Sequence, residues 1–150
     1  MKIYLPEITF SAAHYIPGHK GKCAGIHGHT YFIKDLTIDM GVPILDKMGI
    51  SVDFGDVKQY FKDEWDHKFI IPKSHKMFLE SALLTFPEEL DPPKVNNLKP
   101  VEFTSAEGIA EMMQYELVDI VNPKDIGFQP VSQSDIHFKL FEGPNQAVEI

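Results

Sequence analysis

Three histidines and the chain's only cysteine form the pattern in this sequence that is best suited to chemistry. They lie in the segment Cys23-Ala-Gly-Ile-His27-Gly-His29 and at an isolated His14 upstream. If that segment is a β-strand, His27 and His29 point to the same face, because successive side chains alternate between the faces of a strand. Three neutral imidazoles that leave a fourth position open are typical of a catalytic zinc site, whereas structural zinc sites usually close with four ligands.

The spacing leaves two interpretations of these residues open. In the first, His14, His27 and His29 bind a metal ion, and the thiol of Cys23 is a reactive group beside the metal and not necessarily a ligand. In the second, His27 and His29 are surface residues of a glycine-bounded turn, and Cys23 is a small buried hydrophobic residue. A match to a motif is only a hypothesis and does not decide between them.

The length and cysteine content narrow the class of protein. A chain of 150 residues is expected to form a single domain over residues 1–150, with a core that needs no disulfide or metal in order to fold. One cysteine cannot form an internal disulfide, which fits a reducing compartment. The N-terminus lacks the apolar core of a signal peptide, and no apolar run is long enough to span a bilayer. We therefore expect a cytoplasmic protein without a membrane partner.

The charge of the chain argues against one class of partner. The net charge is −8, and all 14 basic residues are lysines. An acidic chain without arginine is poorly suited to nucleic acids, whose recognition depends on basic patches. Lysine can still bind a phosphate group as a point charge, though without the bidentate fork of arginine. The candidates for phosphate binding are His19, Lys20, Lys22 and Lys68, and any one of them could equally belong to a solvated loop.

Alternation of apolar residues predicts the strands that would position the histidines. Residues 2–13 are expected to form one strand, whose apolar positions share a face with His14. Residues 29–40 are expected to form a second strand, and a change of apolar phase in its middle indicates a β-bulge. Residues 132–142 and 146–150 are expected to form two further strands joined by a hairpin-like turn.

Two amphipathic helices are expected between these strands. The first covers residues 53–65, and Asp53 can cap its start. The second runs from about Ser105 to Val121, where Thr104-Ser-Ala-Glu107 fits a capping box. Between the helices, residues 72–100 form a proline-rich excursion, in which residues 78–84 could be a strand or one to two helical turns. The order of elements indicates an α+β fold, with both helices on one face of a four-stranded antiparallel sheet. Such a sheet has two open edges, which makes pairing with other subunits plausible.

Six short motifs follow one another along the chain. They are Phe10-Ser-Ala-Ala-His14, Cys23-Ala-Gly-Ile-His27-Gly-His29-Thr-Tyr31, Asp53-Phe-Gly-Asp-Val-Lys58, Trp65-Asp66-His67, Thr104-Ser105-Ala106-Glu107 and Phe141-Glu142-Gly-Pro-Asn145. In this order they resemble the 6-pyruvoyl-tetrahydropterin synthase family, including its 6-carboxy-tetrahydropterin synthase branch in queuosine and archaeosine biosynthesis. The resemblance covers almost the whole chain except about residues 72–100, where the family's segment is usually shorter.

The resemblance implies a particular architecture, the tunnelling fold. Its unit is a four-stranded antiparallel sheet with two helices on one face. Subunits of such proteins join edge to edge into a barrel, commonly a trimer, and two trimers stack into a hexamer. The resemblance therefore implies a homo-oligomer, either a trimer or a dimer of trimers, with active sites between subunits.

The resemblance also implies chemical roles for individual residues. The three histidines would bind Zn²⁺, whose open position can hold and acidify vicinal hydroxyls of a substrate. Cys23 matches the general base, because a nearby metal or imidazolium lowers the pKa of a thiol from its usual value of about 8.5. Asp66 and His67 match the acid/base pair, in which the carboxylate fixes the tautomer of the imidazole. The alternative for this pair is the solvated end of a helix.

A second set of residues matches the pterin pocket of the family. Glu142 matches the pterin anchor, since a carboxylate can accept both N–H groups of a 2-amino-pyrimidine edge. Ser105 and Glu107 match the helix-start motif that lines the pocket, although the usual Pro-Thr is Thr104-Ser105 here. The alternatives are a turn residue for Glu142 and a capping acid for Glu107.

The expected function is that of a zinc-dependent lyase acting on 7,8-dihydroneopterin triphosphate. In the carboxy branch, the product is 6-carboxy-5,6,7,8-tetrahydropterin, and triphosphate and acetaldehyde are released. One alternative is 6-pyruvoyl-tetrahydropterin synthase proper, which belongs to a tetrahydrobiopterin-type pathway. Another is a non-catalytic zinc- or pterin-binding protein on the same fold.

Overall fold

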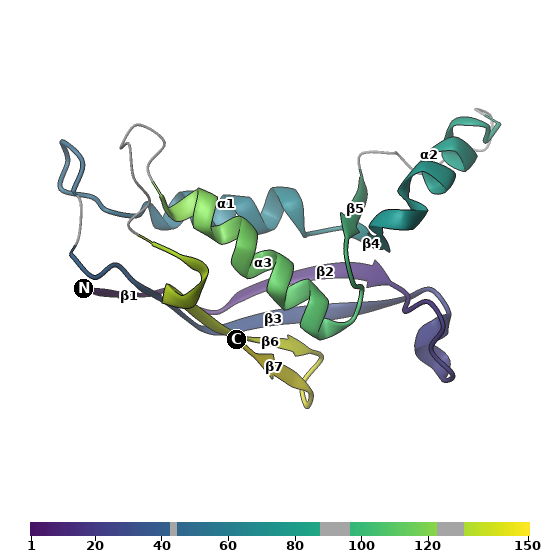
Figure 1. Cartoon of the computed structure of the whole chain (residues 1–150), viewed down its shortest axis with the longest axis horizontal. Helices are drawn as coiled ribbons and strands as arrows, with labels where there is room; N and C mark the ends of the chain where they lie inside the picture. The colour runs from purple at the N-terminus through teal and green to yellow at the C-terminus, as the bar shows by residue number, and fades with distance from the viewer. Residues whose placement is uncertain (43–44, 88–96, 123–130) are drawn as a thin grey trace.

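The computed structural model describes residues 1–42, 45–87, 97–122 and 131–150, which form one mixed β-sheet and three α-helices. Figure 1 shows helices α1 and α3 lying over one face of the sheet, and α2 projecting away from it. The strands are β1 (Lys2–Tyr4), β2 (Ile8–His14), β3 (His27–Asp39), β4 (Lys68–Pro72), β5 (Leu98–Val101), β6 (Ile136–Glu142) and β7 (Ala147–Glu149). The α-helices are α1 (Phe54–Glu64), α2 (Lys76–Leu84) and α3 (Ala106–Val121), and 3₁₀ turns occur at η1 (Lys22–Ala24), η2 (Lys73–His75) and η5 (Gln133–Asp135).

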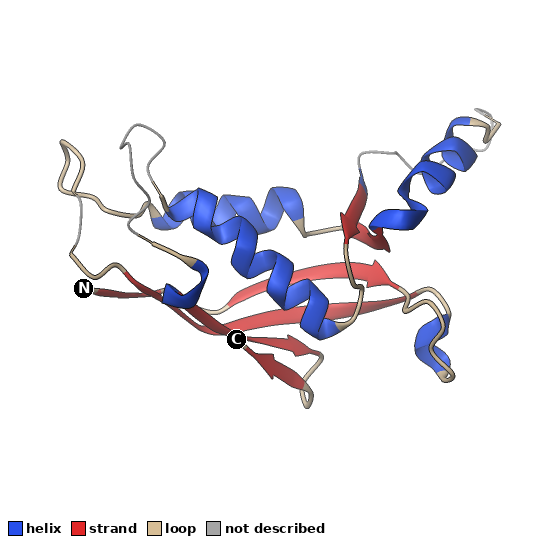
Figure 2. Cartoon of the chain, viewed as in Figure 1, coloured by secondary structure: helices blue, strands red, loops and turns tan. Residues whose placement is uncertain are grey.

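The sheet is larger than the expected four antiparallel strands. It has seven strands in the order β5-β4-β2-β3-β6-β7, and β1 also pairs with β3. The pairs β1–β3, β2–β3, β3–β6 and β6–β7 are antiparallel, as expected. The pairs β2–β4 and β4–β5 are parallel, so the prediction of a purely antiparallel sheet is wrong. Figure 2 shows the mixed sheet under the two helices.

The segment predicted as one strand over residues 2–13 is two strands. Residues 5–7, which include Pro6, separate β1 from β2, and both strands pair with β3. Proline has no backbone N–H to donate to a ladder of hydrogen bonds, which accounts for the break. The long partner β3 contains the expected bulge: its register against β6 shifts between Lys34 and Thr37, and Asp35 has a φ of 55°.

Two strands that were not predicted flank the proline-rich excursion: β4 leads into it, and β5 lies at its end. β4 and β5 extend the sheet beyond β2, and β5 lies at the end of the strand order. Pro100 is tolerated within β5 because an edge strand has one side without ladder partners. Residues 78–84 lie in α2 and are helical, which decides between the two predicted alternatives.

The two expected helices are present, but only one is capped as predicted. Asp53 caps α1 by accepting a hydrogen bond from the N–H of Gly55 at 2.7 Å. At α3 the cap is Ser105, whose hydroxyl accepts from the N–H of Gly108 at 3.3 Å. The predicted capping box from Thr104 to Glu107 is therefore wrong, because the third helical position is a glycine, which has no side chain.

The core lies between the sheet and these two helices. Val57, Tyr60 and Phe61 of α1 are buried, as are the residues of α3 that repeat every four positions from Ile109 to Val121. Phe54, the first residue of α1, is 48% exposed. Among the described residues, no helix has the length and apolarity needed to cross a membrane.

Candidate metal centre

The pairing of β2 with β3 brings the three histidines to one face of the sheet. His14 lies opposite His27, and His29 lies opposite Ala12, two residues before His14. Directly opposed residues of an antiparallel pair point to the same face, so all three imidazoles point to the side that α1 and α3 cover. One ring nitrogen from each histidine lies within 4.8 Å of the others. The structure therefore brings together the three predicted ligands, and metal binding itself stays a prediction.

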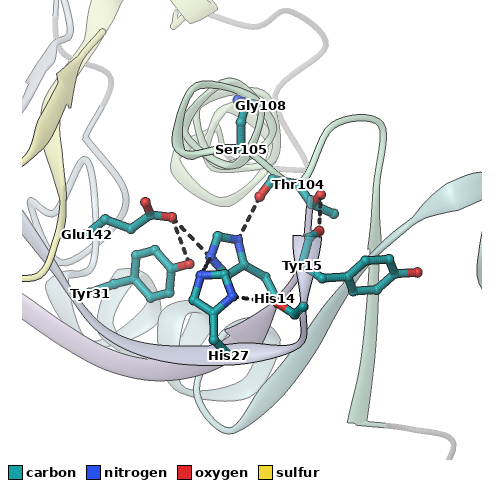
Figure 3. A network of polar contacts seen from close by, with 9 residues as sticks. His14, Tyr15, His27, Tyr31, Thr104, Ser105, Gly108 and Glu142 are labelled. Carbon is teal, nitrogen blue, oxygen red and sulfur yellow. Dashed lines mark hydrogen bonds and ion pairs between the residues drawn. The ribbon is translucent and has the colours of Figure 1, made fainter. Parts of the chain in front are cut away.

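Backbone carbonyls fix the tautomers of two of these rings. Nδ1 of His14 lies 2.7 Å from the carbonyl oxygen of Thr104, and Nδ1 of His27 lies 2.8 Å from that of Gly25 (Figure 3). A carbonyl oxygen can only accept, so each Nδ1 carries the hydrogen, and a neutral ring then has its lone pair on Nε2. Metal-binding histidines almost always donate their other ring N–H in this way.

The lone pairs on Nε2 of His14 and His27 converge at a distance that suits a metal ion. Nε2 of His14 lies 3.1 Å from Nε2 of His27. Two lone pairs this close repel unless a proton or a cation lies between them. Nitrogen ligands at 2.0–2.1 Å from a tetrahedral zinc ion would be about 3.3 Å apart, close to the distance seen here. The donor set and its geometry therefore fit Zn²⁺.

The surroundings of His14 favour its neutral form. Its side chain is only 1% exposed, and burial lowers the pKa of the imidazole, as do the neighbouring His27 and His29. The carbonyl of Thr104 and the carboxylate of Glu142 partly oppose this shift. A ligand histidine must be neutral, so the lowered pKa keeps His14 ready to bind a metal at neutral pH.

Glu142 lies beside the histidine cluster at the end of β6. Its Oε1 is 3.4 Å from Nε2 of His14 and accepts a hydrogen bond from the hydroxyl of Tyr31 at 3.2 Å. Burial, together with this carboxylate, raises the pKa of Tyr31, so the phenol stays a donor. The carboxylate of Glu142 is 17% exposed, which leaves it accessible to a ligand. The structure thus places the candidate pterin anchor next to the candidate metal centre.

The start of α3 lies over the same cluster (Figure 3). Thr104 is buried, and its hydroxyl donates to the carbonyl of Tyr15 at 2.6 Å while its own carbonyl accepts from His14. Ser105 caps the helix and is half-buried, whereas Glu107 is exposed. Sequence reasoning missed Thr104 as a partner of His14. The only available signal was that Thr104 stands where the family usually has proline.

Asp66 and His67 form a contact beside β2, just before the start of β4. Oδ2 of Asp66 lies 2.9 Å from Nδ1 of His67, and Oδ1 accepts from the N–H of Ser11 at 2.9 Å. Burial by itself would raise the pKa of Asp66, but the hydrogen bonds from Ser11 and His67 outweigh it and lower the pKa. The carboxylate is therefore ionised and can hold the ring of His67 in one tautomer.

The ring of His67 faces outward. Its side chain is 83% exposed. The backbone N–H of His67 donates to the carbonyl of Ser11 at 2.7 Å, and the residue has a left-handed backbone conformation with a φ of 57°. It lines an open cavity of about 460 Å³ with Ser11, Thr30 and Lys68, and His29 of the histidine cluster also lines this cavity. The pair is thus ordered, and its imidazole is directed away from its own chain.

Cys23 lies apart from both groups. It is half-buried in η1, where its carbonyl accepts from the N–H of Ile16 at 2.8 Å. Its thiol is not a member of the histidine cluster, and none of the described contacts joins it to Asp66 or His67. The three candidate catalytic residues are therefore not assembled within one chain.

The chain is similar in sequence to known proteins. A family model described as 6-pyruvoyl tetrahydropterin synthase matches residues 5–149. The chain is 33% identical over 148 residues to 6-carboxy-5,6,7,8-tetrahydropterin synthase of Rickettsia bellii, and 30% identical over 148 residues to the enzyme of that name in Rickettsia felis. Each alignment covers 96% of this chain and 96% of the relative.

Two solved structures share the fold. An uncharacterized protein of Wolinella succinogenes has a TM-score of 0.61 and 18% identity, with 100% of this chain and 97% of that chain covered. The 6-pyruvoyl tetrahydropterin synthase of Caenorhabditis elegans has a TM-score of 0.54 and 18% identity, with 100% of this chain and 95% of that chain covered. At these identities the likeness concerns the fold alone.

Proposed function

The chain belongs to the 6-pyruvoyl tetrahydropterin synthase family, and from this premise we propose that it is a zinc-dependent lyase of the 6-carboxy branch. Its substrate is 7,8-dihydroneopterin triphosphate. With one molecule of water, the substrate yields 6-carboxy-5,6,7,8-tetrahydropterin, acetaldehyde and triphosphate. The names of the Rickettsia relatives support this branch over the pyruvoyl branch. The match over residues 5–149 supports a single domain of this family.

One observation carries the proposal: the convergence of Nε2 of His14 and His27 beside the carboxylate of Glu142. In this arrangement the carboxylate accepts the two N–H groups at the 2-amino edge of a pterin as a bidentate pair. The imidazoles of His14, His27 and His29 would hold a zinc ion. When bound there, zinc supplies a Lewis acid that polarises the vicinal hydroxyls of the substrate.

The chain's own residues move the protons. Cys23, as a thiolate, removes a proton from the side-chain carbon that carries a polarised hydroxyl. His67, held in one tautomer by Asp66, exchanges protons with the substrate as the ring is reduced internally, so no redox cofactor is needed. Ser105 and Glu107 contribute to the wall of the pterin pocket at the start of α3.

The outward direction of His67 supports a site shared between chains. Cys23 and the Asp66–His67 pair have no described contact within one chain, and the ring of His67 is 83% exposed. We therefore assign Cys23 of one chain and the Asp66–His67 pair of another to the same active site. This requires an edge-to-edge homo-oligomer, a trimer or a dimer of trimers, as in the barrel assembly of the tunnelling fold.

The test is mass spectrometry of the products formed from 7,8-dihydroneopterin triphosphate by zinc-loaded protein. The expected product is 6-carboxy-5,6,7,8-tetrahydropterin, with acetaldehyde detected separately. The variant Cys23→Ala should keep one zinc ion per chain and lose turnover, whereas Met48→Ala, a change at an exposed side chain in the β3–α1 loop, should keep both.

Three other results of this experiment would contradict parts of the proposal. A 6-pyruvoyl product would place the chain in the other branch of the family. Unchanged substrate with full zinc content would favour a non-catalytic zinc- or pterin-binding protein. Turnover by Cys23→Ala at the parental rate would show that Cys23 is not the general base.

A further inference from the structure

Helix α2 is an apolar helix without a place in the core. No residue of α2 is buried, although six of its nine residues are apolar. The other three are Lys76, Glu80 and Ser81. The side chains of Met77, Phe78 and Leu84 are 82%, 74% and 77% exposed. Figure 1 shows α2 projecting from the body at the upper right, away from α1 and α3.

A helix of this kind needs a partner. Isolated helices shorter than about 12–15 residues are marginal in water, and most helical stability in proteins comes from packing of the apolar face. The base of α2 is fixed to the chain, because Nδ1 of His75 lies 2.5 Å from the hydroxyl of Tyr15, the residue after His14. The helix therefore extends from the metal-centre end of the sheet and presents its apolar side chains outward.

A complementary surface lies on α3. A groove of about 360 Å³ opens between α3 and η5, and its apolar lining includes Phe103, Met112 and Tyr115. Phe103 is 62% exposed and Tyr115 is 60% exposed, so aromatic surface is available to a partner. Glu102 and Glu111 give the rim of this groove a negative charge.

The charges and positions of the two surfaces suit each other. The base of α2 carries the exposed Lys73, which complements Glu102 and Glu111 on the groove. The exposed Lys76 adds positive charge there, although its Nζ also lies 3.7 Å from Glu80 of the same helix. α2 lies on the side of the sheet that ends in β4 and β5, whereas α3 and η5 flank β6, which leads to β7 at the other end of the strand order. When identical chains join edge to edge in a closed ring, the first side of one chain meets the second side of the next.

We propose that α2 docks into the α3–η5 groove of a second copy of this chain, with Met77 and Phe78 packed against Phe103, Met112 and Tyr115. The contact is heterologous: each chain gives one α2 and receives one. It adds a helix contact to the edge-to-edge assembly, and it uses none of the residues assigned to zinc or catalysis.

Disulfide trapping tests the contact directly. In a Cys23→Ala background, which removes the only native thiol, one chain carries Phe78→Cys and a differently tagged chain carries Met112→Cys. Mild oxidation of the mixed assembly should link the two kinds of chain. Neither variant should form disulfide-linked dimers when it is oxidised by itself.

Removal of the apolar surface tests the energetic role of α2. The double change Met77→Ser and Phe78→Ser should lower the mass of the assembly in sedimentation velocity at micromolar concentration. Val42→Ser is the matched control, since Val42 is 83% exposed and lies outside α2. Both proteins should keep the same zinc content, because all three imidazoles come from one chain. Loss of zinc would contradict the assignment of the metal centre and would not bear on the docking of α2.

Two results would overturn the proposal. Linkage of Phe78→Cys chains to one another, without linkage to Met112→Cys chains, would show that α2 packs on α2 of another copy. Unchanged mass of the double variant, with no mixed disulfide, would show that a second copy of the chain does not cover α2.

Discussion

Thr104 holds His14 with two different groups. Its carbonyl accepts the Nδ1 hydrogen of His14, and its hydroxyl donates to the carbonyl of Tyr15, the residue that follows β2. The two contacts fasten the start of α3 to the end of β2 at the point where the imidazole must be oriented. Partners of this kind matter because the orientation of a ligand ring decides whether its lone pair points at the metal.

We expect Thr104→Val to weaken zinc binding without removing a ligand. The carbonyl stays, but the lost hydroxyl releases it from Tyr15, and changes of this kind typically reduce metal affinity by about 10–100-fold. Thr104→Ser keeps the hydroxyl and should bind zinc nearly as tightly as the parent. Competition with a chromophoric chelator measures both affinities. Equal affinity of the valine variant and the parent would contradict a positioning role for the hydroxyl.

His14 also links the stability of the metal-free protein to pH. Burial beside His27 and His29 lowers its pKa in the folded chain below the ordinary 6.5. Below about pH 6.5 the unfolded chain therefore binds a proton that the folded chain excludes, and the free energy of unfolding falls as the pH falls. The titration of His14 alone can change the free energy of unfolding by at most about 1.4 kcal/mol per pH unit.

Urea unfolding of chelator-treated protein measures this effect. We expect the free energy of unfolding to decrease from about pH 7 to about pH 5, in the range just below the ordinary pKa of histidine. His14→Gln removes the titrating group and should flatten this part of the curve. An equally steep curve for the glutamine variant would assign the effect to other groups.

Among the elements, β5 is joined to both core helices by one buried lysine. The side chain of Lys99 is 8% exposed, and its Nζ lies 2.7 and 3.0 Å from the two carboxylate oxygens of Glu116 on α3. It also lies 3.3 Å from Glu64 of α1 and 4.6 Å from the ring centroid of Trp65. Tyr60 of α1 donates to the same Glu116 at 2.7 Å. The network connects the strand that follows the proline-rich segment to the rest of the fold.

Removal of one partner from this network should destabilise the fold more than removal of both charges. Glu116→Ala leaves the buried ammonium of Lys99 without its main counter-charge, and we expect a loss of about 2–4 kcal/mol in the free energy of unfolding. The double variant Lys99→Met and Glu116→Leu keeps the volume and removes both charges, so it should lose less. Urea denaturation compares the two. A larger loss in the double variant would contradict this explanation.

The sequence predicted elements well where one face of each element is buried. The alternation in β2 and the bulge in β3 could both be predicted from the sequence, because burial on one side imposes a period of two residues. β4 and β5 could not be predicted. Both are short strands that contain a proline and pair in parallel over only a few residues. Parallel pairing joins segments that are distant in sequence, so no local sequence pattern predicts it.

The candidate site was predictable to the same extent. The three histidines were found from their residue type and spacing, since few side chains bind zinc. The carbonyl of Thr104 could not be found, because it belongs to the backbone and reaches His14 from 90 positions away. The outward direction of His67 could not be predicted from the sequence either, because it depends on a left-handed backbone conformation at a residue other than glycine.

At the scale of the whole molecule, none of the described contacts within one chain joins Cys23 to the Asp66–His67 pair. The ring of His67 is 83% exposed and lines an open cavity, which His29 of the histidine cluster also lines. If a second chain completes the site, two variants that are each inactive can restore one another in a mixed assembly. One site then takes Cys23 from one chain and His67 from another.

Co-expression of differently tagged Cys23→Ala and His67→Ala chains tests this expectation. Neither variant alone should turn over substrate, and mixed assemblies should recover up to about a quarter of the parental rate, because in random assembly about half the sites have an intact Cys23 and about half of these an intact His67. A mixture of Cys23→Ala and His27→Ala chains is the control. Cys23 and His27 lie four positions apart and serve the same site from the same chain, so this mixture should stay inactive. If the first mixture also stays inactive while both variants assemble with normal mass, the site is completed within one chain.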